Sequence, residues 1–187
     1  MNLNENQLAT LKAAIIADPN LAAARAIHSS VGTQMIADYL NTNSDLTVWR
    51  TSVQTQVLLD SITWANLTMN YPPDGTLEWL CRSESCRGKQ SNIDTILGSR
   101  ETINPSLPNI RAGLQDALTN VYSVNPASQP IAAGWVAVRA AMQRLATKME
   151  KIFADTQASP GSLVVEGQID EFTIRKLAFA DNGDWLL

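Results

Sequence analysis

Apolar residues at helical spacing run through most of the chain and predict a mainly α fold. The stretch from Glu5 to Ala17 places Leu11 and Ile15 on one face of a first helix. Asn4 stands at its N-cap position and Gln7 three residues later, which is the spacing of a capping box. The sequence therefore predicts both the helix and its starting residue.

Further helices follow from the same periodicity and from the residues that start and stop helices. Asp18 is a candidate N-cap with Pro19 at the first helical position, and Asp170 is a candidate N-cap for the last helix. Two loops are predicted at Tyr71–Gly75 and at Ser123–Pro130. The predicted helices after the first are residues 19–27, 33–40, 53–58, 76–97, 110–121 and 171–178.

The most regular pattern lies between residues 135 and 152. Its apolar residues are spaced by three and four, and they are Trp135, Val138, Met142, Leu145, Met149 and Ile152. This spacing predicts the longest helix of the fold, with packing inside a bundle favoured over a coiled coil between subunits, which needs a longer repeat. On that interpretation Leu145→Ala leaves a core cavity and costs about 2 to 5 kcal/mol.

Two short stretches have the composition of β-strands. Leu46 to Trp49 is one, and Leu163-Val164-Val165, closed by Gly167, is the other. The second stretch needs an edge to pair with, either the stretch around Val48 or a neighbouring subunit. The expected class is mainly α, a helical bundle with a minor β element and an extended C-terminal arm. The expected divisions are an N-terminal helical subdomain at residues 1–45, a helical body at 46–156 and the arm at 157–187.

The C-terminal arm is expected to dock on a neighbour rather than to complete the core of its own domain. Leu163, Val164 and Val165 form a strand that lacks a partner in its own segment, and Trp185 and Leu186 would make an apolar patch in water. Trp49 and Arg50 join them as candidate interface residues; Trp is enriched at interface cores, and Trp49 has a non-helical setting.

Catalytic and metal-binding patterns are absent from the sequence, so we expect no enzyme activity, no cofactor and no metal. His28 is the only histidine, and it is expected to be a surface or cap residue. Cys81 and Cys86 lie five residues apart in a predicted helix, on different faces, and are expected to be free thiols. Acidic residues stand singly, without the clusters that bind metal ions.

The fraction of charged residues and the net charge limit the classes of partner that the protein is expected to bind. Charged residues make up 17% of the 187 residues, below the roughly 25% typical of soluble chains. The net charge of −4 argues against a general attraction to nucleic acid, although a local basic face remains an alternative. No apolar stretch is long enough to span a membrane, and the first residues lack the pattern of a secretory signal.

Several segments together resemble a family of small proteins encoded in tailed bacteriophage genomes and prophages, commonly among structural genes. The segments are residues 17–23, 47–53, 103–114, 147–154 and 165–167. The resemblance touches most of the chain in scattered pieces, and none of the pieces is a functional motif. It implies a virion component with no catalytic residue, made in the cytoplasm of the bacterial host.

Size and helical content are similar to those of connector or adaptor proteins that form a ring between capsid and tail. The leading hypothesis is therefore a head-to-tail connector or neck subunit in a symmetric ring. Its expected partners are other copies of itself and portal, tail or capsid proteins, with neither a small-molecule substrate nor a membrane, while DNA could pass through the ring without sequence-specific contacts. A capsid decoration or minor tail protein, and a nucleic-acid-binding accessory protein, are the alternatives.

Overall fold

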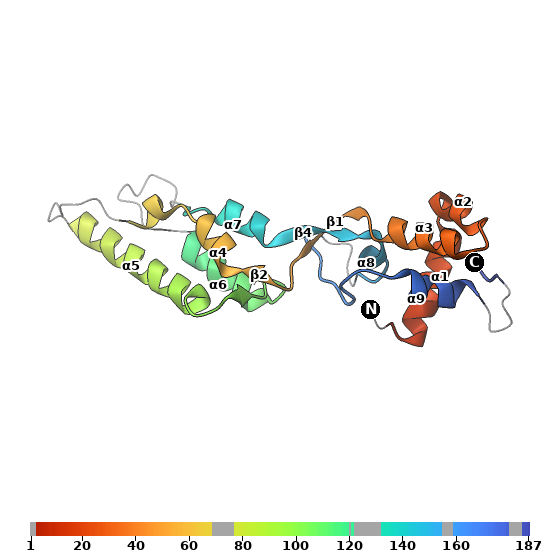
Figure 1. Cartoon of the computed structure of the whole chain (residues 1–187). Coiled ribbons are helices and arrows are strands. Elements are labelled where there is room, and N and C mark those ends of the chain that lie inside the picture. Colours follow the sequence, from red (N-terminus) through yellow and green to blue (C-terminus); the bar gives the residue numbers. More distant parts are fainter. Residues whose placement is uncertain (1–2, 69–76, 120, 122–131, 155–158, 180–184) are drawn as a thin grey trace. The chain divides into compact units, whose positions relative to one another are not determined.

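The computed structural model describes residues 3–68, 77–119, 121, 132–154, 159–179 and 185–187, and the side chains of 77–79 are not described. Within these ranges α-helices predominate, accompanied by two small two-stranded sheets (Figure 1). The mainly α class with a minor β element is therefore confirmed. The loops predicted at Tyr71–Gly75 and Ser123–Pro130 lie outside the described residues.

The chain folds into two compact units rather than the three consecutive segments expected from the sequence. Unit 1 consists of residues 1–48 and 145–187, and unit 2 of residues 49–144. The expected divisions at 45/46 and 156/157 differ from this arrangement. The reason is that the C-terminal residues pack against the N-terminal helices within unit 1.

Unit 1 is built mainly from helices around one apolar core. Its helices are α1 (Glu5–Ala17), the 3₁₀ helix η1 (Pro19–Leu21), α2 (Ala22–Arg25), α3 (Ser30–Leu40), α8 (Lys148–Ile152) and α9 (Glu171–Ala178). Helix α3 packs along α9 and against α2. The side chains of Leu11, Ile15, Ile36, Met149 and Ile174 are fully buried in this core.

Two helices of unit 1 begin where their capping residues predict. The Asn4 side chain accepts a hydrogen bond from the Gln7 backbone N–H, and the Gln7 side chain accepts one from the Asn4 N–H, both at 2.9 Å. The Asp170 carboxylate accepts a hydrogen bond of 2.7 Å from the Thr173 N–H. These bonds satisfy N–H groups that a helix leaves unpaired at its start.

The C-terminal segment completes the core of unit 1, so the prediction of an arm that leaves its own domain is wrong. Val165, Ile169 and Ile174 are buried among the apolar residues of α1 and α3. The Asn41 side-chain amide donates to the Ile169 carbonyl at 2.8 Å and accepts from the Ile169 N–H at 2.9 Å. Apolar burial and this paired hydrogen bond together hold the segment in place.

The segment predicted as one helix from Trp135 to Ile152 is three elements. Helix α7 (Trp135–Ala141) is followed by strand β4 (Gln143–Thr147), which pairs with β1 (Asn43–Trp49), and then by α8. Thr147 forms a capping box with Glu150, so a new helix starts at residue 148. Leu145 therefore lies on a strand and is 45% exposed, which contradicts its predicted core position.

The strand predicted at Leu163–Val165 is reduced to single bridges. Gly161 forms a parallel bridge with Val48, and the Gly161 N–H donates to the Thr47 carbonyl at 2.9 Å. Leu163 forms an antiparallel bridge with Ala154. The chain around Val48 thus pairs with Gly161 and not with the predicted stretch, whose Leu163 pairs with Ala154 instead.

Unit 2 has its own core. Its elements besides α7 are β2 (Val53–Gln54), α4 (Thr55–Asp60), η2 (Trp64–Leu67), α5 (Leu77–Leu97), β3 (Thr102–Ile103) and α6 (Pro108–Leu118). Strands β2 and β3 are antiparallel, with Val53 opposite Ile103. The helix expected from Val53 begins two residues later because residues 53 and 54 join this ladder. Helix α5 is continuous through Gly88 and packs against α6.

Candidate functional site

Helix α7 of unit 2 is held in place by Gly134, the residue before it, and by Val138 near its middle. Gly134 precedes it with a φ of 89°, and a Cβ there would lie 2.7 Å from the Ser61 carbonyl oxygen and 2.8 Å from the Thr63 nitrogen. Glycine is therefore required for this close approach to the chain that follows α4. Val138 is fully buried, and α7 packs against α4 and α6.

The other side of α7 is apolar and exposed. Val136 has 80% of its surface exposed, and Ala137 and Ala140 are exposed as well. Arg139 is the only charged residue of the helix. We refer to Val136, Ala137 and Ala140 as the α7 face.

A groove lies beside the α7 face, between α7 and the chain around β2. Its volume is about 390 Å³. Val57 of α4 is 44% exposed and lines the groove together with Ala140 and Ala141. Arg50, Ser52, Val53 and Gln54 complete the lining. The groove thus combines an apolar wall with one cationic side chain, which suits a partner that carries both apolar and acidic groups.

Trp49 lies near two guanidinium groups of unit 2. The Arg111 guanidinium carbon is 4.6 Å from the centre of the indole ring, and that of Arg139 is 6.0 Å from it. Arg111 also donates to the carbonyls of Pro105 at 2.7 Å and Ser106 at 2.6 Å. Burial lowers the pKa of the Arg111 guanidinium from its ordinary value. Trp49 is half-buried and packs against the core of unit 2, so part of its surface has a structural role.

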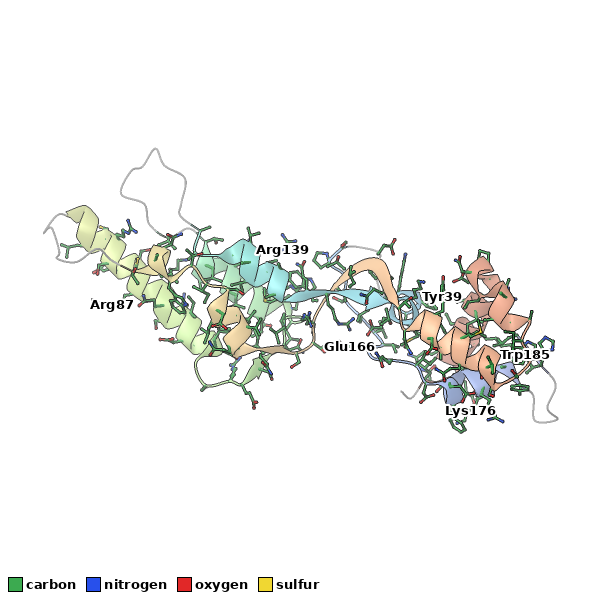
Figure 2. All side chains as sticks on the ribbon, turned by 45° about the horizontal axis from the view of Figure 1, so that its top comes forward. Tyr39, Arg87, Arg139, Glu166, Lys176 and Trp185 are labelled. Atoms are coloured by element: carbon green, nitrogen blue, oxygen red, sulfur yellow. The ribbon has the colours of Figure 1, made fainter. Side chains whose placement is uncertain are left out.

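Hydrogen bonds from both its backbone and its side chain fix the position of Arg50. Its N–H donates to the Met142 carbonyl at 2.9 Å, and its Nε donates to the Gln143 carbonyl at 3.0 Å. Neither Arg50 nor Arg139 forms an ion pair with any residue that the structure describes. Both side chains are exposed, and Figure 2 shows Arg139 at the surface of unit 2. Their charges are therefore available to a partner.

Unit 1 has a larger pocket, of about 710 Å³, with compensated charges. The Lys148 ammonium lies 3.4 Å from the centre of the Tyr39 ring, and Lys151 forms an ion pair of 2.6 Å with Asp45. Burial alone would raise the pKa of Asp18 in this pocket, but hydrogen bonds from Asn20 and Tyr39 and the charge of Lys148 lower it below 3.8. Because each lysine already has an aromatic or acidic neighbour, the pocket has no strong preference for one sign of ligand charge.

The predicted interface residues of the C-terminal segment lie in unit 1, in three different settings. Leu163 is half-buried against Leu46 and Val48, and Val165 belongs to the core. Val164 is 62% exposed. Only Val164 of the three presents most of its surface to a partner.

Trp185 is packed against neighbouring rings rather than left in water. Its ring stacks on His28 with centroids 4.9 Å apart and meets Phe179 edge to face at 5.0 Å. The Leu186 N–H donates to the Ala178 carbonyl at 2.6 Å, while the Leu186 side chain is 43% exposed. His28 thus has a packing role that the sequence did not indicate.

The structure does not gather the predicted interface residues at one place within either unit. Trp49 and Arg50 belong to unit 2, and the other predicted residues, Leu163, Val164, Val165, Trp185 and Leu186, belong to unit 1. The sequence pattern did not identify Val57, Val136 and Ala140 as interface candidates. Val136 lies off the three-and-four stripe of its helix, and that position was the only sequence signal that could have indicated an outward apolar residue.

Other sequence predictions concern metals, thiols and membranes. Cys81 and Cys86 both lie on α5 and are free. The described residues contain no group of three or more His, Cys, Asp or Glu side chains able to hold a metal ion. Among the described helices, none combines the length and apolar character needed to cross a membrane.

Comparisons of the chain with protein-family models, with curated proteins and with solved structures find no match.

Proposed function

We propose that this protein is a non-enzymatic subunit of a tailed-bacteriophage virion that assembles with copies of itself into a symmetric ring. Within the virion, we propose the head-to-tail connector or neck as its place. The segments that resemble a phage family motivate the setting, and the surface of unit 2 motivates the mode of action.

The α7 face is the observation that carries this proposal. A valine that is 80% exposed, on a helix with two further exposed alanines and one charged residue, leaves apolar surface in contact with water. The exposed Val57 extends that surface into the adjacent groove. Contiguous apolar surface next to charged groups is typical of protein contact sites.

The test is the number of copies of this chain in purified phage particles. A connector ring predicts one small, fixed copy number per particle, equal to the symmetry of the ring measured on the isolated protein. The chain should also be retained in tailless heads or in isolated necks, where a connector belongs. Its absence from purified particles would contradict the proposal.

The alternative virion roles give different results in the same experiment. A capsid decoration protein would be present in numbers that scale with the capsid surface, and a minor tail protein would remain with isolated tails. Either result would keep a structural role and remove the connector assignment.

A further inference from the structure

The groove and the α7 face have a charge opposite to that of the chain as a whole. Arg50 lines the groove, and Arg139 is on α7 next to the groove residue Ala140. Neither forms an ion pair with a described residue, whereas the whole chain has a net charge of −4. The chain has 18 acidic residues against 14 basic ones, so other surfaces of a second copy can supply carboxylates to these two arginines.

We infer that the groove and the α7 face bind a different, acidic and apolar surface of a second copy of this chain, in a head-to-tail contact. The apolar part of that surface would cover Val136 and enter the groove beside Val57. Its carboxylates would pair with Arg50 and Arg139. This inference rests on the proposed ring and identifies which surface of unit 2 forms the contact.

The charges decide between head-to-tail and two-fold packing. In a two-fold contact the same surface is present on both sides, so Arg50 and Arg139 of one copy would face the same arginines of the other. Like charges opposed in an interface repel one another and weaken the contact. A contact between two different surfaces avoids this repulsion, and such contacts form rings when the rotation closes.

The apolar component favours a protein over a nucleic acid as the occupant. A phosphate backbone would pair with Arg50 and Arg139, but it would leave Val57 and Val136 facing a charged polymer. An apolar protein surface removes both valines from water, which stabilises the contact in proportion to the area buried.

The test measures self-association of the full chain by light scattering after size exclusion, for wild type and for Arg139→Glu. The Arg139 side chain is exposed and makes no hydrogen bond or ion pair with a described residue, and its guanidinium lies 6.0 Å from the centre of the Trp49 ring. The variant should therefore keep its fold, as checked by its circular dichroism and melting temperature. We expect the dissociation constant between copies to rise by about tenfold or more. Added salt should weaken the wild-type assembly and have less effect on the variant.

Arg87→Glu is the matched control, because it makes the same charge change in the same unit. Arg87 is exposed on α5, away from Arg139 in unit 2 (Figure 2). Association should be nearly unchanged in this control. Val136→Asp provides a second variant at the proposed contact. It should weaken association because it replaces an apolar residue of the α7 face, and it leaves Arg50 and Arg139 unchanged.

Each other outcome overturns a specific part of the inference. Stronger association of Arg139→Glu would indicate a two-fold contact, in which the new glutamate faces Arg50 of the other copy. An unchanged wild-type-like oligomer would remove the groove from the interface, and if the variant also lost retention on duplex DNA, the arginines would belong to a nucleic-acid site. A wild-type chain that stays monomeric at every concentration would contradict the proposed ring itself.

Discussion

Leu145 and Met149 lie four residues apart on the same predicted stripe, but the structure buries only Met149. Met149 has no exposed surface, whereas Leu145 is 45% exposed on β4. We predict that Met149→Ala lowers the free energy of unfolding by about 2 to 5 kcal/mol, because it leaves a cavity. Leu145→Ala should cost less than about 1 kcal/mol. Urea denaturation of both variants tests this, and equal losses would show that residues 145–149 form a buried helical stripe after all.

Asn41 is the residue whose side chain ties the C-terminal segment to α3. Its amide pairs with both the N–H and the carbonyl of Ile169, so Asn41→Ala leaves two backbone groups of a buried residue without their partner. We predict a loss of about 1 to 3 kcal/mol in the free energy of unfolding. Asn43→Ala, at an exposed position of β1, is the control and should change it by less than about 0.5 kcal/mol. Similar small losses in both variants would mean that the paired hydrogen bond contributes little.

Asp170 predicts a pH dependence for unit 1 that can be isolated by substitution. Hydrogen bonds from the Thr173 side chain and backbone lower the pKa of Asp170 below 3.8 in the folded chain. A carboxyl whose pKa falls on folding stabilises the fold above its unfolded pKa and loses that effect as the pH drops through its folded pKa. Asp170→Ala should therefore cost about 0.5 to 2 kcal/mol at neutral pH, as other lost N-caps do.

The size of that cost should shrink below about pH 4, since the wild-type carboxylate is then also being protonated. Unfolding free energies of wild type and variant, measured across the acid range, give the comparison. A cost that is the same at neutral and acid pH would show that the charge of Asp170 does not stabilise the start of α9.

Among the elements, those with local signals were predicted and those decided by distant contacts were not. Helices α1 and α9 have the expected bounds because Asn4, Gln7 and Asp170 mark their starts within the sequence. The segment 135–152 was mispredicted because pairing of β4 with β1, almost a hundred residues earlier, overrides the helical spacing. The Thr147-x-x-Glu150 capping box was the local sign of a new helix, and the regular stripe concealed it.

The candidate site was predictable only in part for the same reason. The enrichment of Trp at interfaces and a non-helical setting indicated Trp49, and Arg50 is its neighbour in the sequence. The groove is lined by residues between 50 and 57 and by residues 140 and 141. These two segments are far apart in the sequence, and no local pattern predicts that they lie together. The C-terminal interface residues were chosen because their segment lacked a partner, and the structure supplies partners for Val165 and Trp185 inside unit 1.

The contribution of the C-terminal segment to the folding of unit 1 can be tested by removing the segment. Helix α9 packs along α3, and Ile174 and Ala178 are fully buried. A chain that ends at Pro160 should therefore lose the cooperative unfolding of unit 1, whereas unit 2 has its own core and should stay folded. Amide hydrogen exchange of the truncated chain measures both. Retained protection of α1 and α3 would mean that the segment is an appendage.

For the whole molecule, the two units suggest a division of tasks that agrees with the proposed ring. Unit 1 contains both the N-terminal and the C-terminal residues of the chain, and it has a pocket with balanced charges. Unit 2 presents the α7 face, with Arg139 on the same helix, and a groove lined by Arg50; neither arginine has an acidic partner among the described residues. The sign of these charges makes the proposed assembly sensitive to salt and opposes two-fold pairing of the groove.

If the chain forms a symmetric ring, the mass of the intact assembly is a fixed multiple of the mass of one chain. Native mass spectrometry of the full chain at low salt should give one dominant species with a fixed number of copies above two, and electron micrographs of the same sample should show closed rings. A monomer or a simple dimer as the largest species, at every concentration and in the absence of other virion proteins, would show that the chain does not form a ring by itself.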